Sequence, residues 1–197
     1  MKWLVGVDEA GRGPLAGPVA VGVAVVPMDF DWDLIPGVGD SKKVSPKNRE
    51  AVFLRAHELK TNKVIDFKVS LISVSVIDTK GITYAVRLGI QKCLASLNLD
   101  PNVCDVRLDG LLKAPEEFLT QATIIKGDSK EKSIGLASIL AKVTRDRHME
   151  AQALKYPLYN FDVHKGYGTK KHLDYIKLYG LSAIHRHTFC HSAKSQF

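Results

Sequence analysis

The sequence has few cysteines and no long hydrophobic run. Its three cysteines, Cys93, Cys104 and Cys190, are odd in number and widely separated along 197 residues. This spacing matches neither a disulfide framework nor a common zinc motif, so we expect buried thiols in a reducing compartment. No apolar stretch approaches the ~20 residues of a membrane span, and strand-like sequence begins where a signal peptide would lie. We therefore expect a cytoplasmic protein without a membrane partner.

Acidic residues are also scarce relative to basic ones. The chain has 28 Lys and Arg against 21 Asp and Glu, which gives a formal net charge of +7. From Val163 onward there are six basic residues and a single acid, Asp174. A basic excess favours a polyanionic partner such as nucleic acid. A solubilising basic surface would give the same composition, so charge alone leaves both interpretations open.

The hydrophobic pattern predicts an α/β fold. We expect strands over residues 2–8, 18–27, 63–72, 103–108 and 122–125, and helices over 45–60, 82–97, 133–154 and 169–179. Small residues in the 133–154 helix, Ala137, Ser138 and Ala141, suit close packing on a sheet. No repeat or linker-like stretch interrupts the chain. The sequence therefore predicts one domain over residues 1–197, a mixed five-stranded sheet flanked by helices, and a monomer.

Four carboxylates follow strand-like runs. Asp8 and Glu9 end the first run, and Asp109 and Asp128 follow two later ones. Neighbouring side chains of a strand point to opposite faces, so we expect the strand to end or bulge at Asp8 and Glu9. Acids at adjacent strand ends can meet in one cleft, where they would bind Mg²⁺ or Mn²⁺. The alternative is that these aspartates are ordinary turn residues.

A glycine-rich turn follows the first acids directly. Gly11-Arg12-Gly13 offers flexible backbone amides and a cation, a combination suited to phosphate. Gly11, Gly13 and Gly17 also suggest a dinucleotide-binding turn and hence an oxidoreductase. Their spacing is G-x-G-x-x-x-G, however, and the acids that precede the turn would repel a pyrophosphate.

Seven blocks of the sequence resemble the type 2 ribonuclease H (ribonuclease HII) family. They are residues 6–14 (GVDEAGRGP), 40–43 (DSKK), 108–110 (LDG), 126–128 (KGD), 137–147 (ASILAKVTRDR), 164–169 (HKGYGT) and 185–189 (HRHTF). The blocks are spread over nearly the whole chain and follow the family order. The resemblance implies a ribonuclease H-like sheet and a C-terminal helical portion, residues ~160–197, that binds substrate. It also implies endonucleolytic cleavage of RNA in RNA–DNA hybrids and of single ribonucleotides embedded in duplex DNA.

The resemblance also assigns roles to individual residues. Asp8, Glu9, Asp109 and Asp128 would be catalytic and would hold two divalent ions, Mn²⁺ or Mg²⁺, about 3.5–4 Å apart. The implied products carry a 3′-hydroxyl and a 5′-phosphate. The substrate-binding residues implied are Gly11, Arg12 and Gly13 at the ribose 2′-hydroxyl, Tyr167 at the sugar beside the scissile phosphate, and Lys42, Lys43 and Lys165 at phosphates.

Several features of the sequence also have other interpretations. Asp146 matches the family, but its place in a long helix predicts that it anchors a neighbouring Lys or Arg. His185, His187, Cys190 and His191 suggest a zinc cluster, yet their spacing fits no common finger. Tyr167 is equally compatible with an ordinary surface loop. An inactive module that only binds RNA–DNA hybrids is the alternative function.

Overall fold

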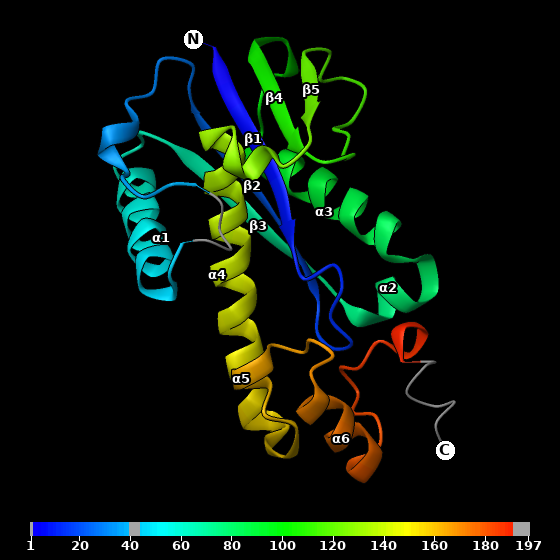
Figure 1. Ribbon diagram of the computed structural model, residues 1–197. Coiled ribbons are helices and arrows are strands. Elements are labelled where there is room, and N and C mark those ends of the chain that lie inside the picture. Colours follow the sequence, from blue (N-terminus) through cyan, green and yellow to red (C-terminus); the bar gives the residue numbers. More distant parts are fainter. Residues whose placement is uncertain (1, 40–43, 191–197) are drawn as a thin grey trace.

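A mixed five-stranded sheet forms the centre of the molecule (Figure 1). The structure is a computed structural model that describes residues 2–39 and 44–190. The strand order is β3-β2-β1-β4-β5, with β1, β2 and β3 antiparallel and β4 and β5 parallel to β1. The strands are β1 (Trp3–Ala10), β2 (Val19–Pro27), β3 (Asp66–Ile72), β4 (Cys104–Asp109) and β5 (Gln121–Ile124). The predicted α/β fold with five strands is confirmed.

Six α-helices and five short 3-10 helices connect these strands in the described chain. The α-helices are α1 (Pro46–Thr61), α2 (Val74–Lys80), α3 (Ile82–Leu97), α4 (Lys132–Lys155), α5 (Phe161–His164) and α6 (Lys170–Tyr179). The 3-10 helices are η1 (Trp32–Leu34), η2 (Pro101–Val103), η3 (Gly127–Ser129), η4 (Pro157–Tyr159) and η5 (His187–Phe189). All four predicted helices are confirmed. The sequence pattern missed α2 and α5 because helices of seven and four residues are too short for a clear hydrophobic period.

Helices cover both faces of the sheet. Helices α2 and α3 pack on one face, and α1 and α4 pack on the other (Figure 1). Strand β2 is buried along eight of its nine residues because it lies between β1 and β3 and contributes side chains to both layers. This explains why its sequence is almost continuously apolar.

Helix α4 lies unusually close to the sheet because glycines face it. A Cβ at Gly6 would lie 2.0 Å from the Ser133 carbonyl oxygen, and one at Gly22 would lie 2.4 Å from the Ala137 carbonyl oxygen. The close packing predicted for this helix is therefore confirmed. Its consequence for function is that Ser138 reaches the carboxylate of Asp8 on β1.

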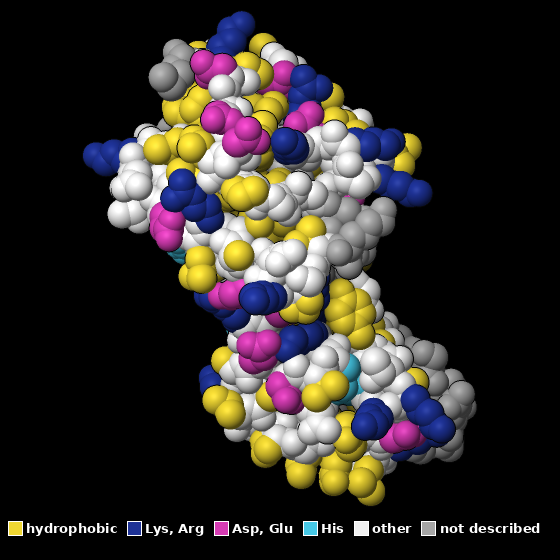
Figure 2. Space-filling view, turned by 60° about the vertical axis from the view of Figure 1, so that its left-hand side comes forward, with side chains coloured by type: hydrophobic (Ala, Val, Ile, Leu, Met, Phe, Trp, Pro, Cys, Tyr) yellow, Lys and Arg dark blue, Asp and Glu magenta, His cyan; other side chains and the backbone are white. Residues whose placement is uncertain are grey.

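The C-terminal helices gather at the far end of α4 (Figure 1). They enclose a small core of their own, which contains Met149, Tyr159 and Phe161. The loop between β1 and β2 joins this core to the sheet, because the Leu15 N–H donates to the Gly166 carbonyl and the Arg186 N–H donates to the Leu15 carbonyl, at 2.8 and 2.7 Å. Figure 2 shows that the surface narrows between the two parts. None of the helices in the described chain combines the length and apolar character needed to cross a bilayer.

Candidate active site

A pocket opens where β1 and β4 separate. The pairing of these parallel strands ends at Val7 and Leu108, so the acids that follow lie at an open edge. The cavity there has a volume of about 290 Å³. It is lined by Asp8, Glu9, Ala10, Gly11, Arg12, Gly13, Asp109, Asp128, Ser138, Lys142 and Tyr167. All four predicted acids, the glycine-rich turn and Tyr167 thus share one cavity.

The predicted end or bulge of the first strand at these acids is wrong. Strand β1 continues to Ala10 in regular register, with Asp8 opposite Gly22 and Glu9 opposite Val21. Asp8 and Glu9 therefore leave opposite faces of β1. Both still reach the pocket because β4 no longer covers this edge of β1, so the cavity can extend around it.

Asp8 is a buried carboxylate, with 5% of its surface exposed. Its Oδ1 accepts a hydrogen bond from the Glu9 N–H at 2.7 Å. The pKa of Asp8 is raised to about 8, mainly by burial and also by the charges of Glu9 and Asp109, while the Ser138 hydrogen bond opposes the shift. The pocket therefore penalises a second and third negative charge unless a cation compensates them.

Glu9 has one satisfied and one unsatisfied oxygen. Its Oε1 accepts from Arg12 Nη1 at 3.1 Å, whereas Oε2 is buried without a hydrogen-bond partner in the described chain. Burial raises the pKa of Glu9, Arg12 opposes that shift, and the charge of Asp109 adds to it. A buried, unpartnered carboxylate oxygen beside other carboxylates fits a hard divalent cation, which prefers oxygen ligands.

Asp109 and Asp128 are linked through the turn that precedes η3. Asp109, the last residue of β4, accepts a hydrogen bond from the Gly127 N–H at 2.6 Å. Asp128 follows within η3 and lines the pocket. Within residues 2–39 and 44–190, no three or more Asp, Glu, His or Cys side chains are already arranged to hold a metal ion. The acids fit a divalent cation by their chemistry, but their side chains would have to converge on it.

The two glycines of the Gly11-Arg12-Gly13 turn differ in their surroundings. Gly11 has φ +88°, and a Cβ there would lie 1.9 Å from Arg145 Nε. Packing therefore requires glycine at this position. A Cβ at Gly13 would meet no atom within 4 Å. Packing gives no reason for glycine at 13, whereas a ligand held against the backbone would.

Tyr167 is 41% exposed and faces cations on α4. Arg145 Cζ and Lys142 Nζ lie 5.7 and 5.9 Å from the centroid of its ring. The side chain therefore lies at the pocket, next to Lys142.

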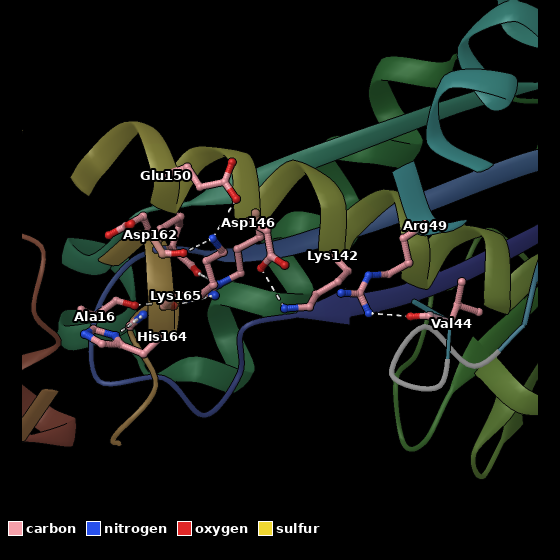
Figure 3. Close-up of polar contacts among 12 residues, drawn as sticks. Ala16, Val44, Arg49, Lys142, Asp146, Glu150, Asp162, His164 and Lys165 are labelled. Carbon is pink, nitrogen blue, oxygen red and sulfur yellow. Dashed lines mark hydrogen bonds and ion pairs between the residues drawn. The ribbon is translucent and has the colours of Figure 1, made fainter. Parts of the chain in front are cut away.

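Ser138 and Lys142 line the pocket but were not predicted as site residues. Lys142 pairs with Asp146 at 2.8 Å (Figure 3), which confirms that Asp146 anchors a neighbouring lysine. Ser138, Lys142 and Asp146 follow one another at intervals of four, so they lie on one face of α4. This spacing was the sequence signal that could have identified Ser138 and Lys142 as site residues. It became informative only once the structure showed that Ser138 forms a hydrogen bond with Asp8.

The predicted phosphate-binding lysines lie elsewhere or outside the described residues. Lys165 Nζ pairs with Glu150 at 2.7 Å and donates to the Asp162 carbonyl (Figure 3). It is not among the residues that line the pocket. Lys42 and Lys43 lie outside the described residues.

Comparison with known proteins gives one consistent family. The sequence profile described as Ribonuclease HII matches residues 5–192. The chain is 45% identical over 188 residues to a ribonuclease HII of Caldicellulosiruptor bescii, which covers 95% of this chain and 86% of that protein. Among solved structures it resembles the ribonuclease H2 of Pyrococcus horikoshii, with 29% identity, 98% of each chain covered and a TM-score of 0.72. It shares its fold with a Bst ribonuclease HIII in complex with Mn²⁺, with 18% identity, 99% of this chain and 70% of that chain covered, and a TM-score of 0.71. The chain therefore belongs to the ribonuclease HII family.

Proposed function

We propose that this protein is a metal-dependent endoribonuclease that cleaves the RNA strand of RNA–DNA hybrids and single ribonucleotides embedded in duplex DNA. The observation that carries the proposal is that one pocket is lined both by four carboxylates and by the residues expected to recognise ribose. The carboxylates are Asp8, Glu9, Asp109 and Asp128, and the ribose-recognising residues are Gly11, Arg12, Gly13 and Tyr167. Membership of the ribonuclease HII family supports the same assignment.

The four carboxylates are the proposed ligands for Mg²⁺ or Mn²⁺. Two such ions, when bound, supply Lewis-acid polarisation of the scissile phosphate and lower the pKa of a bound water. Ser138 and the Glu9 N–H hold the Asp8 carboxylate in place, and Arg12 holds one oxygen of Glu9. The Gly127 N–H does the same for Asp109. These hydrogen bonds keep Asp8, Glu9 and Asp109 at the pocket, from where they would converge on a bound ion.

Ribose recognition is assigned to the turn and to Tyr167. A backbone amide can donate to a 2′-hydroxyl, which is the group that distinguishes RNA from DNA. The absence of a Cβ at Gly13 lets the sugar approach the backbone. The Tyr167 ring would pack against the neighbouring sugar, while lysines, with Lys42, Lys43 and Lys165 as candidates, would contact phosphates without reading sequence.

A nicking assay tests the proposal. A duplex containing one ribonucleotide is incubated with the protein in Mg²⁺ or Mn²⁺, in EDTA, and in EDTA followed by excess metal. We expect cleavage at the ribonucleotide only when a divalent ion is available. Specific binding to the duplex without cleavage under any of these conditions would instead favour the inactive hybrid-binding module.

A further inference from the structure

Arg186 is a fully buried arginine that binds the glycine-rich turn. Its Nη2 donates to the Gly11 carbonyl at 2.7 Å, its Nη1 to the Arg12 carbonyl at 2.9 Å, and its Nε to the Gly17 carbonyl at 2.9 Å. No salt bridge to this guanidinium is found within residues 2–39 and 44–190. All its donors that form hydrogen bonds are therefore directed to the backbone of one loop.

These bonds orient the amides of the same turn. In a trans peptide the carbonyl and the following N–H point in opposite directions. Because Arg186 binds the carbonyls of Gly11 and Arg12, the N–H groups of Arg12 and Gly13 point away from it. Neither amide donates a hydrogen bond within the described chain. Both residues line the pocket, so these two N–H groups are the candidate donors to a ligand there.

The neighbouring residue, His185, starts a second chain of hydrogen bonds. The Ser182 N–H donates to His185 Nδ1 at 2.8 Å, so the proton of the neutral ring lies on Nε2. That nitrogen donates to His172 Nε2 at 3.0 Å, and His172 Nδ1 then donates to the Tyr167 carbonyl at 2.8 Å. Each neutral ring thus has one consistent tautomer, and the chain ends on the backbone of Tyr167.

We infer that the adjacent residues His185 and Arg186 form a positioning unit for both halves of the ribose-recognition site. Arg186 orients the Arg12 and Gly13 amides, and His185 holds the Tyr167 backbone through His172. The inference rests on the proposed function. The segment itself is held to the β1–β2 loop, because the Arg186 N–H donates to the Leu15 carbonyl and the Gly17 N–H donates to the Ile184 carbonyl.

Filling space alone would not require this arrangement. A buried guanidinium without a carboxylate loses its hydration, and an apolar side chain of similar volume could fill the same space without that cost. The fork of donors in arginine can bind several carbonyls at fixed angles, which the single ammonium of lysine cannot reproduce. Carbonyls held at fixed angles also fix the direction of the N–H groups that follow them. Donation to a 2′-hydroxyl requires such fixed N–H groups.

The test separates positioning from stability. Arg186→Lys and His172→Leu are made in an Asp109→Asn background, in which substrate is expected to bind without being cut. The dissociation constants are measured for a duplex with one ribonucleotide and for the same duplex as DNA throughout, at one salt concentration. We expect each variant to weaken binding of the ribonucleotide duplex about tenfold and to leave binding of the DNA duplex unchanged.

Two further variants complete the design. His172→Asn keeps a donor near the Tyr167 carbonyl and should restore most of the discrimination that His172→Leu loses. Tyr159→Phe removes a hydrogen bond to the Gly180 carbonyl in the same C-terminal portion without touching the recognition site, and should leave discrimination intact. If Arg186→Lys and His172→Leu discriminate as the parent does, or lose both duplexes equally, the positioning role is wrong. If the wild type fails to nick the ribonucleotide duplex with metal, the proposed function fails instead.

Discussion

Single residues of the pocket have separable roles in folding and in function. Gly11 is required by its positive φ and by the Arg145 side chain, whereas the structure around Gly13 has room for a Cβ. Asp8 and Glu9 are buried acids whose raised pKa values show that the pocket disfavours their charge. Substitutions at these positions should therefore divide into those that damage the fold and those that damage only function.

The two glycines provide a matched pair. Gly11→Ala should lower the thermal midpoint clearly, because the new Cβ collides with Arg145 and the residue must hold a left-handed φ. Gly13→Ala should leave the midpoint within a degree or two, as for a surface substitution of about 0.5 kcal/mol or less, and should reduce cleavage of a ribonucleotide duplex. Thermal unfolding and initial rates measure the two effects. Equal unfolding losses in both variants would contradict this division.

Asp8→Asn should abolish cleavage and preserve the fold. The amide can still accept the Glu9 N–H, and because it is uncharged it avoids the cost of ionising a buried acid beside Glu9 and Asp109. The metal-free variant should therefore unfold at the same temperature as the wild type or a higher one, while its rate falls by several orders of magnitude. Near-normal turnover of this variant would remove Asp8 from the catalytic assignment.

At the level of elements, α4 connects the core with the site. Its interior residues pack on β1 and β2, and one of its faces brings Ser138 and Lys142 to the pocket, with Asp146 paired to Lys142. The sequence predicted the existence of this helix and its close approach to the sheet. It could not predict that Ser138 contacts Asp8, because this contact depends on the exact position of α4 on the sheet, where Gly6 and Gly22 allow it to approach closely. The sequence also predicted that the first strand ends or bulges at Asp8 and Glu9. In the structure β1 continues, and only its pairing with β4 ends at this point.

The buried histidines of the C-terminal portion predict a dependence of stability on pH. Burial lowers the pKa values of His172 and His185 to about 4 each. In the unfolded chain these residues titrate near their ordinary value of 6.5. Between pH ~6.5 and ~4 these histidines bind protons in the unfolded state but not in the folded state, so their contribution to the free energy of unfolding falls as the pH falls. The raised pKa values of Asp8 and Glu9 act in the opposite direction, so the histidine contribution is measured as a difference between variants.

Equilibrium denaturation at pH 7.5, 6 and 5 would measure this dependence. His172→Asn should make the loss between pH 7.5 and 5 shallower than in the wild type, whereas Tyr159→Phe should lower stability equally at each pH. If His172→Asn showed the same change in stability between pH 7.5 and 5 as the wild type, His172 would not stay neutral in the folded protein.

At the scale of the whole molecule, a sheet that carries the acids is joined to a basic C-terminal portion by the loop that is proposed to recognise ribose. The charge count indicated the basic C-terminal portion, and the strand-like runs before the acids predicted that the acids gather at one edge of the sheet. The joint itself depends on hydrogen bonds between residues more than 150 positions apart, such as Arg186 and Gly11. No local pattern encodes such contacts, so the His185-Arg186 arrangement was not predictable.

Lys170 and Lys171 on α6 should contribute general affinity for duplexes. Both are exposed, and phosphate contacts by lysine are blind to sequence and sensitive to salt. The double substitution to alanine should weaken binding to ribonucleotide and DNA duplexes alike and reduce the slope of log K against log salt by up to about 2. Binding titrations between low and moderate salt measure it. A loss confined to the ribonucleotide duplex would contradict this role.

The chemistry of the cut ends tests the central claim most directly. A duplex with one ribonucleotide is cleaved in Mg²⁺ or Mn²⁺, and the new termini are analysed by mass. Attack by a water at an acid-lined metal site predicts a 3′-hydroxyl on one fragment and a 5′-phosphate on the other, with no cleavage by Asp109→Asn. A 2′,3′-cyclic phosphate with a 5′-hydroxyl would mean that the ribose hydroxyl, and not a water at the acids, is the nucleophile. Undiminished cleavage by Asp109→Asn would contradict the assignment of the reaction to this acid-lined pocket.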